Sequence, residues 1–281
     1  MTSSDASPSE SPRPDAKGQP ITQASLARDL SALGVAPGQT LLVHAAMSRL
    51  GWVFGGTQAI IAALLETLGP QGTLLMPTHS SDMTEPSRWQ QPPVPAAWLA
   101  RIRAGMPTWD PDHTPTRQMG ALAEAFRSWR GVRRSGHPYG SFAALGPAAE
   151  LLTAGHEPGC AFGEDSPIGA LNRLDGGVLL LGVGHGNNTS LHLAEYRATW
   201  AGKRHHQEGS AMMVDGARRW VTYTELVHQD DDFLDIGAGF DKATESGTDL
   251  SQGLIGAADS RLMRQRPLVD FATRWMNEHR E

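Results

Sequence analysis

The stretch that decides the fold is residues 178–197, with the sequence VLLLGVGHGNNTSLHLAEYR. Its apolar start predicts a buried strand, its glycines predict a turn, and Asn188 or Thr189 is suited to cap the helix that follows. On that helix His192 and Glu195 stand three residues apart, which is close enough for their side chains to interact. We therefore expect a base and a carboxylate on one side of a helix, just beyond the carboxyl end of a strand.

The composition predicts one large α/β domain, or one domain with a subdomain. The chain has 281 residues, of which 40% are hydrophobic, and 24 basic against 30 acidic residues give a net charge of −6. This charge argues against a nucleic-acid partner and would suit a cationic small molecule, although mild acidity can also serve solubility alone.

Cysteine content and hydropathy bear on the compartment. Cys160 is the single cysteine, so the chain cannot form an internal disulfide. The sequence contains no apolar run near the roughly 18 residues of a membrane span, and its start lacks the basic-then-apolar pattern of a signal peptide. We expect a cytoplasmic protein with no membrane partner.

The order of segments predicts a βαβ unit near the start of the chain. Residues 1–20 are rich in Ser and Pro and are predicted to be a disordered leader, followed by a single domain over 21–281. Helices are predicted at 21–33 and at 57–68, the second with Thr57 as its cap, and strands at 40–44 and 72–77. Such a unit pairs its strands in parallel and places ligands at their carboxyl ends.

Further along, residues 83–117 form a long insertion rich in Pro and Trp, which is typical of a lid or binding loop but could be a plain surface loop. The remaining predicted elements are helices at 117–129, 147–152 and 262–279, and a hairpin of 211–214 with 218–224 that turns at Asp215-Gly216.

Several familiar motifs are missing. The glycines at 182, 184 and 186 resemble a dinucleotide fingerprint, but Asn187 stands where its third glycine is needed. The chain has no G-x-S-x-G, so it lacks the nucleophile elbow of α/β-hydrolases. His185, His192 and the pair 205–206 do not fall into a zinc-binding pattern, and we expect no metal.

The spacing of residues leaves two questions open. His192 could be a catalytic base or a buried structural histidine, and a base would need a carboxylate to fix its tautomer. Glu195 on the same helix and Glu225 after the hairpin are both candidates. Residues 55–57, Gly-Gly-Thr before a helix, could seat a phosphate or could simply start that helix.

A series of motifs resembles the aminoglycoside 3-N-acetyltransferase family. The match spans about residues 22–240, with the motifs in the family's order. They are LVH (42–44), GWVFGG (51–56), GTL (72–74), MPTHS (76–80), HTPTRQMG (113–120), HP (137–138), SFAA (141–144), GEDSP (163–167), LLLGVGH (179–185) and NTSLHLAE (188–195).

This resemblance implies an α/β fold with a mixed central sheet flanked by helices, in which the Pro/Trp-rich insertion forms part of the substrate cleft. It implies acetyl transfer from acetyl-coenzyme A to the 3-amino group of 2-deoxystreptamine aminoglycosides, giving antibiotic resistance. His192 matches the family's catalytic histidine, and Glu225 falls where the family places a carboxylate near it. We expect direct transfer in a ternary complex, since no base adjoins Cys160 in the sequence to mark it as an acyl carrier.

The resemblance also assigns binding residues. On the coenzyme A side these are His44, Ala45, Met47, Ser48, Gly55, Gly56, Thr57, Met119 and Ser141, and on the aminoglycoside side they are His79, Asp82, Glu164, Glu195 and Asp230. Many relatives have Ser-Ser where this chain has Ala45-Ala46, so two hydroxyl donors are missing here.

Two alternatives remain at this level. One is an N-acetyltransferase for another amine metabolite, and the other is a non-catalytic protein that sequesters aminoglycosides. The sequence specifies neither the preferred aminoglycoside nor the choice between monomer and homodimer.

Overall fold

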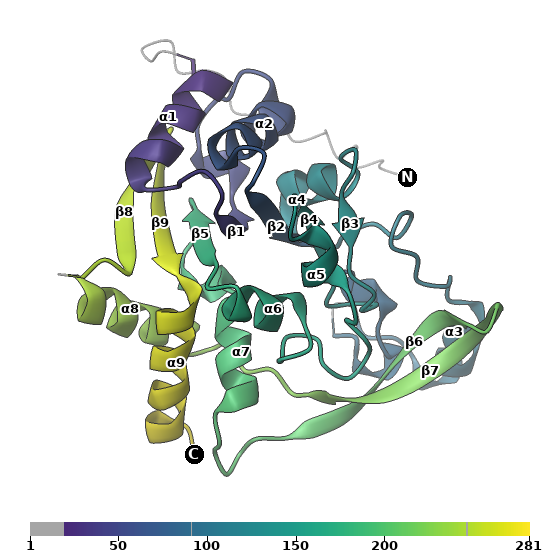
Figure 1. The fold of residues 1–281 in the computed structure, drawn as a ribbon. Helices are drawn as coiled ribbons and strands as arrows, with labels where there is room; N and C mark the ends of the chain where they lie inside the picture. Colours follow the sequence, from purple (N-terminus) through teal and green to yellow (C-terminus); the bar gives the residue numbers. More distant parts are fainter. Residues whose placement is uncertain (1–19, 91, 246) are drawn as a thin grey trace, which may run out of the picture.

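The computed structural model describes residues 20–90, 92–245 and 247–281. All but the last residue of the predicted leader therefore lies outside the described residues. A mixed seven-stranded sheet with the order β3-β4-β2-β1-β5-β9-β8 runs through the described chain, and helices cover both of its faces (Figure 1). This confirms the predicted fold class.

The strands of the sheet are β1 (Thr40–Ala45), β2 (Thr73–Pro77), β3 (Arg133–Arg134), β4 (Phe142–Leu145), β5 (Gly177–Leu181), β8 (Leu250–Ile255) and β9 (Ala258–Arg264), and a separate hairpin contains β6 (His205–Val214) and β7 (Ala217–Leu226). The helices are α1 (Gln23–Leu33), α2 (Gly56–Leu68), α3 (Leu99–Gly105), α4 (Gly120–Arg127), α5 (Ala149–Thr153), α6 (Pro167–Arg173), α7 (Ser190–Arg197), α8 (Phe233–Thr244) and α9 (Gln265–His279).

Three parallel strands form the centre of the sheet. β1 pairs in parallel with β2 on one side and with β5 on the other, whereas β4 and β9 join the sheet antiparallel. The carboxyl ends of β1, β2 and β5 therefore meet at one edge. After β1 the chain continues to β2 on one side, and after β5 it continues toward β8 and β9 on the other side. This edge is therefore where open α/β sheets form a ligand crevice.

Alternation along the strands divides the core between the two faces. In β1, Leu42 packs into the cluster that also contains residues of α6, α7 and α9, whereas Leu41 and Val43 pack into the cluster with α1, α2 and α4. β5 divides its side chains in the same way, because successive side chains of a strand point to opposite faces. The four apolar residues that start the deciding stretch are thus buried on both sides.

The deciding stretch forms its predicted elements, and Asn188 is the one of its two cap candidates that makes a capping bond. Asn188 Oδ1 accepts a hydrogen bond from the Ser190 backbone N–H at 3.2 Å, whereas the Thr189 side chain makes no cap bond. At α2 the predicted cap was wrong, because Gly55 is the N-cap and Thr57 lies inside the helix. Gly55 has a φ of 88°, a backbone conformation that favours glycine.

The C-terminal region departs most from prediction. The expected helix over 262–279 begins only at Gln265, because residues 262–264 belong to β9. β9 pairs with β5 on one side and with β8 on the other. Neither this strand pair nor α8 (Phe233–Thr244) was predicted from the sequence.

The predicted hairpin is present and longer than expected. β6 and β7 each span ten residues, and the turn at Asp215 and Gly216 has φ angles of 51° and 75°, as a two-residue hairpin turn requires. Figure 1 shows this hairpin extending away from the main sheet to lie beside α3.

The insertion packs against that hairpin through a small core of its own. Met83, Met106 and Trp109 are buried against Ala211 of β6. Arg218 of β7 also donates hydrogen bonds to the backbone carbonyl of Met106, from Nε at 3.0 Å and from Nη2 at 2.9 Å. The insertion is therefore a folded part of the domain.

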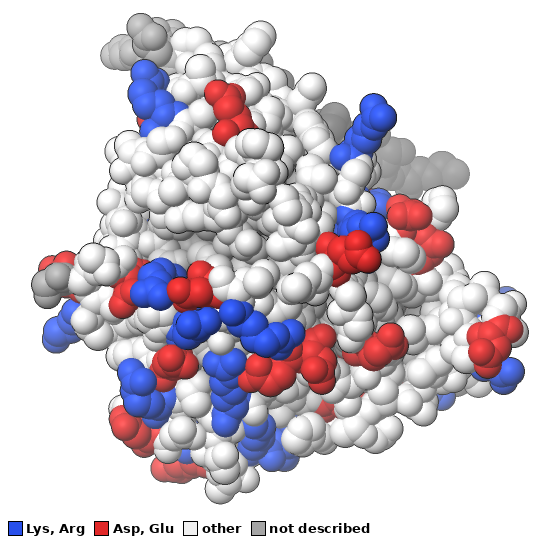
Figure 2. Space-filling model, viewed as in Figure 1, with Lys and Arg blue, Asp and Glu red and all other residues white. Residues whose placement is uncertain are grey.

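On the face shown in Figure 2, Lys and Arg side chains lie interspersed with Asp and Glu side chains. Arg264 Nη2 lies 2.7 Å from Asp175 Oδ2, and Arg197 Nε lies 2.6 Å from Glu164 Oε1. Exposed pairs of this kind contribute little to stability.

Candidate active site

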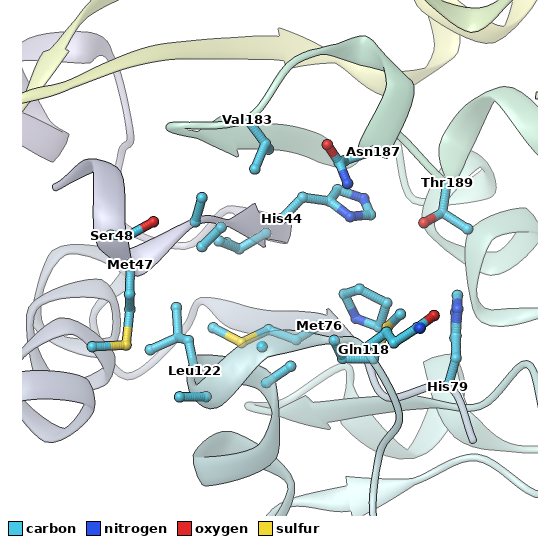
Figure 3. A pocket seen from close by; sticks show the side chains of 18 residues that line it. His44, Met47, Ser48, Met76, His79, Gln118, Leu122, Val183, Asn187 and Thr189 are labelled. Atoms are coloured by element: carbon cyan, nitrogen blue, oxygen red, sulfur yellow. The ribbon is translucent and has the colours of Figure 1, made fainter. Parts of the chain in front are cut away.

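A cavity of about 520 Å³ opens where the central parallel strands end (Figure 3). It is lined from the ends of β1 and β2, from the start of α4 and from the segment after β5. The lining includes Val43, His44, Ala45, Met47, Ser48, Met76, His79, Gln118, Met119, Leu122, Val183, Asn187 and Thr189. Five residues predicted for the coenzyme A side are among them: His44, Ala45, Met47, Ser48 and Met119.

Two histidines project into this cavity (Figure 3). His44 is 6% exposed, and Nε2 of both His44 and His79 is buried and has no hydrogen-bond partner among the residues that the structure describes. Burial, together with the electrostatic effect of His192, lowers the pKa of His44 to about 3 and also lowers that of His79. Both rings are therefore neutral near neutral pH, and a ligand in the cavity could hydrogen-bond to either one.

His192 and Glu195 form a close pair on α7. The distance from His192 Nδ1 to Glu195 Oε2 is 2.5 Å, and the Glu195 carboxylate is completely buried while the His192 side chain is 14% exposed. Burial alone would raise the pKa of Glu195, but hydrogen bonds from His192, Arg280 and the Gln229 backbone lower it below its ordinary value. An ionised carboxylate held in this way fixes the hydrogen of His192 on Nδ1 and leaves Nε2 free.

Aromatic rings surround the His192 imidazole. Phe162 stacks on it with ring centroids 4.9 Å apart and an interplanar angle of 18°, and Phe233 and His228 each have centroids at 4.8 Å. Phe162 also lies 5.1 Å from His79. This row of rings connects the His192–Glu195 pair with the cavity.

Glu225 interacts with Tyr196 and His137. Its carboxylate accepts a hydrogen bond from the Tyr196 hydroxyl, and its Oε2 lies 3.4 Å from His137 Nε2. Burial raises the pKa of Tyr196, and the negative charge of Glu225 raises it further. Among the described residues, the interactions of Glu225 do not include His192. The geometry thus pairs His192 with Glu195, one of the two candidates left open by the sequence.

The other predicted cofactor residues lie outside the cavity lining. Ser141 is fully buried behind it, where its hydroxyl donates to the Thr78 carbonyl at 2.9 Å and accepts from Arg134 Nε at 3.0 Å. Residues 55–57 form the start of α2 and do not line the cavity. Their proposed contacts with coenzyme A stay predictions.

The predicted acceptor residues are spread more widely. Asp82 is exposed, and its Oδ1 lies 3.0 Å from Arg117 Nε. Glu164 is held by Arg197, with Oε1 2.6 Å from Nε. Asp230 is exposed, and no ion pair or side-chain hydrogen bond to it is found in the described chain. Their proposed roles in acceptor binding also stay predictions.

Asp82 borders a second cavity of about 740 Å³ inside the insertion. Most of its lining is apolar and includes Met83, Trp89, Trp98, Ile102, Met106 and Pro107. The sequence predicted a binding loop over these residues but gave no indication that it would enclose an apolar space.

Arg134 fastens the insertion to the sheet. Its guanidinium donates to the carbonyls of Thr78 and Thr114, at 2.6 Å and 2.5 Å, and to the Ser80 hydroxyl at 2.8 Å. Burial lowers the pKa of Arg134 to about 10. These bonds fix the segment that carries His79, and the sequence analysis did not assign Arg134 this role.

Acidification is expected to destabilise the protein because several buried histidines are neutral. Burial lowers the pKa of His44, His156 and His228 to about 3, from an ordinary 6.5. Between these values the unfolded chain binds more protons than the folded chain, so the free energy of unfolding falls as pH drops below 6.5. Thermal unfolding followed by circular dichroism should show Tm falling steadily from about pH 7 to pH 5. A constant Tm would contradict this account.

Metal-binding clusters and membrane-spanning helices are both absent from residues 20–90, 92–245 and 247–281. In those segments no group of three or more His, Cys, Asp or Glu side chains is arranged to hold a metal ion. None of the helices there is long and apolar enough to span a membrane.

Comparison with known proteins identifies the family. The sequence profile described as aminoglycoside 3-N-acetyltransferase matches residues 42–277, which is most of the chain. The chain belongs to this family. Aminoglycoside N(3)-acetyltransferase VII of Streptomyces paromomycinus is 38% identical over 276 residues, which cover 92% of each chain.

Solved structures of family members share the fold. YokD of Bacillus subtilis superposes with a TM-score of 0.90 at 36% identity, over 95% of this chain and 98% of that chain. YokD is described as a prophage-derived aminoglycoside N(3')-acetyltransferase-like protein. AAC-IIIb, in a binary complex with coenzyme A, gives a TM-score of 0.81 at 33% identity, over 92% of this chain and 97% of that chain. As a family member, this protein is an acetyltransferase.

Proposed function

We propose that this protein transfers the acetyl group of acetyl-coenzyme A to the 3-amino group of a 2-deoxystreptamine aminoglycoside, giving antibiotic resistance. The 2.5 Å contact between His192 and Glu195 is the observation that carries the proposal. Only a neutral amine can attack a thioester, so a base beside the cavity is what this reaction needs. Family membership supports the acetyl donor and the acceptor class.

His192 acts as the general base through Nε2, because Glu195 keeps the ring hydrogen on Nδ1. As the proton leaves the acceptor's ammonium group for Nε2, the amine nitrogen bonds to the acetyl carbon and the C–S bond breaks. The charge of Glu195 stabilises the imidazolium that forms. Of the three ammonium hydrogens, the amide keeps one, the departing thiolate takes one through His192, and solvent takes the third.

Transfer is direct in this proposal, within a ternary complex. A cysteine acting as an acyl carrier would need to react as a thiolate. Burial raises the pKa of the Cys160 thiol, which disfavours that form. This disfavours Cys160 as an acyl carrier.

The cavity beside His192 suits the acetyl donor. Val43, Met47, Met76, Leu122 and Val183 supply apolar contacts for an extended chain such as the pantetheine arm. At its inner end the unpartnered Nε2 of His44 offers a hydrogen bond to the thioester. Acetyl-coenzyme A bound there supplies the activated acetyl group, and His192 lies close by.

His44 stabilises the thioester oxygen as negative charge develops on it. In its Nε2–H tautomer the neutral ring is a hydrogen-bond donor that is already buried and needs no reorganisation. The glycine-rich turn after β5 contributes the Asn187 side chain to the lining of the same cavity.

Replacement of His44 by phenylalanine is expected to lower kcat by roughly 10²–10³-fold, because the oxygen loses one donor. The KM for acetyl-coenzyme A should change little, since the aromatic shape is kept. The loss should be the same from about pH 6 to pH 8, because the pKa of His44 near 3 keeps the ring neutral throughout. Steady-state kinetics at several pH values measure both quantities, and a His44→Phe enzyme with normal kcat would exclude this role.

Acetylation of another amine metabolite is the second candidate. The second cavity has a largely apolar lining, including Trp89, Trp98 and Ile102, which would suit an acceptor with an apolar group. YokD, to which this chain is also similar, is named as an aminoglycoside N(3')-acetyltransferase-like protein.

These candidate functions can be distinguished by measuring thiol release from acetyl-coenzyme A in the presence of gentamicin-, kanamycin- and apramycin-type acceptors. Release with any of them supports the proposed function, whereas release only with other amines supports the second candidate. Binding of aminoglycosides without release would favour a sequestering protein. The cytoplasmic location and the choice between monomer and homodimer stay predictions.

A further inference from the structure

Arg280, which follows α9, lies against the buried carboxylate that holds His192. Its Nη1 is 2.8 Å from Glu195 Oε1, and its side chain is only 6% exposed. The other side of the same guanidinium holds Asp232, with Nε at 2.7 Å from Oδ2 and Nη2 at 2.7 Å from Oδ1. A continuous row of four side chains therefore runs from His192 through Glu195 and Arg280 to Asp232.

Two donors fix one oxygen of Glu195 and leave the other for His192. Oε1 accepts from Arg280 and from the Gln229 backbone N–H, both at 2.8 Å, while Oε2 faces His192 Nδ1. A carboxylate with no exposed surface would rotate or take up a proton if these donors were absent. Arg280 thus supplies both an orientation and a compensating charge.

The guanidinium is itself held firmly. Besides its bonds to Asp232, Nη2 donates to the Gln229 carbonyl at 2.8 Å, and the group lies 4.9 Å from the Trp200 ring centroid. Arginine suits this place because its planar fork binds two carboxylates and a carbonyl at once, which a lysine ammonium could do only in part.

We propose that Arg280 is a positioning residue for acetyl transfer. It orients Glu195 Oε2 toward His192 and determines how tightly the His192–Glu195 pair binds its proton. Arg280 favours the deprotonated pair, and Asp232 opposes this by neutralising part of the arginine charge. The inference rests on the proposed role of His192 as base.

Other charged or titratable groups also act on the pair. His228 lies beside His192 at 4.8 Å between ring centroids, the electrostatic effect of His192 reaches His44 and His79, and the charge of Glu195 reaches Lys203. Burial lowers the pKa of His228 to about 3 and also lowers that of His79, so these histidines are neutral over the working pH range. Substitution of Arg280 or Asp232, which are charged groups next to the pair, should change the pH at which His192 and Glu195 take up a proton.

Opposite shifts are expected from two substitutions. In Arg280→Met the pair loses a neighbouring positive charge and binds its proton more tightly, so the acidic limb of the kcat–pH profile should move up by roughly one pH unit. In Asp232→Asn the positive charge of Arg280 is no longer offset by Asp232. The acidic limb of the kcat–pH profile should therefore move to lower pH. At the optimum pH the Arg280→Met enzyme should also lose roughly 10- to 100-fold in kcat, because His192 is less well aimed.

Three comparisons separate positioning from a structural role. Arg280→Lys should recover part of the lost kcat, because a positive charge is restored. Arg264→Met removes an exposed arginine that pairs with Asp175 and Asp249, and should leave the profile unchanged. Guanidinium ion, added at low millimolar concentration, should restore activity to Arg280→Ala. An unmoved acidic limb in both Arg280→Met and Asp232→Asn would overturn the proposal, even if both variants melted at a lower temperature.

A spectroscopic measurement keeps this inference distinct from the proposed function. In proton NMR the His192 Nδ1–H, held 2.5 Å from Glu195, should give a far-downfield resonance in the wild-type protein. The resonance should shift or broaden in Arg280→Met and persist in Arg264→Met. An unchanged resonance in Arg280→Met would contradict the positioning role whatever substrate the enzyme uses, whereas failure to acetylate aminoglycosides would overturn only the proposed function.

Discussion

Replacement of His192 by alanine is expected to lower kcat for acetyl transfer by roughly 10²–10⁴-fold, because the acceptor's ammonium loses the base that takes its proton. Binding of coenzyme A should survive, since His192 lies beside the cavity and is not part of its lining. Steady-state kinetics and calorimetric titration with coenzyme A measure the two effects separately.

A matched control removes a histidine from the surface. His205 at the start of β6 is exposed, so His205→Ala should retain normal kcat and stability. Near-normal turnover by His192→Ala would exclude a general-base role. Loss of coenzyme A binding together with activity would point instead to a collapse of the site.

Replacement of Glu195 by glutamine is expected to lower kcat by roughly 10²–10⁴-fold, the second large effect. The amide can present an N–H to His192 Nδ1, which favours the tautomer with its hydrogen on Nε2 and blocks the base. The substitution also removes one of the two negative charges that pair with the buried Arg280, so Tm should fall as well. Kinetics at the pH optimum and thermal unfolding measure the two effects.

Glu225→Gln provides the comparison that separates the two candidate carboxylates. This residue contacts Tyr196 and His137, so its substitution should reduce stability and leave kcat of the folded enzyme within a few-fold of wild type. If Glu225→Gln lost as much kcat as Glu195→Gln, the orienting role would have to be reassigned or shared.

Local spacing predicted the elements whose signals lie close together in the sequence. The buried strand and helix of residues 178–197 and the hairpin turn at Asp215-Gly216 all depend on apolar runs, glycines and cap residues within a few positions. The three-residue interval between His192 and Glu195 predicted their contact for the same reason, because residues three apart share a side of a helix.

The missed strands carry weak local signals. β8 reads LSQGLI and is mostly exposed at the edge of the sheet, so it lacks the apolar alternation of a half-buried strand. β9 runs directly into α9, and its apolar residues therefore read as the first turn of that helix. β3 has two residues and β4 has four, too few to show a period.

The site contacts that the sequence did not predict join residues that are distant in the sequence. Arg280 stands 85 residues after Glu195, and His228 and Phe162 reach His192 from other segments. Local sequence patterns cannot predict such contacts, because they are created when α7, α8, α9 and the hairpin pack together. The family resemblance pointed to Glu225 as the partner of His192, and only the fold shows which groups that carboxylate contacts.

The most direct test of the central claim is to identify the acetylated product. The purified protein, acetyl-coenzyme A and a gentamicin-type aminoglycoside should give a product with one added acetyl group, and two-dimensional NMR should locate it on the 3-amino nitrogen. The account would be contradicted if every type of 2-deoxystreptamine aminoglycoside were recovered unmodified under conditions where the enzyme releases thiol with another amine.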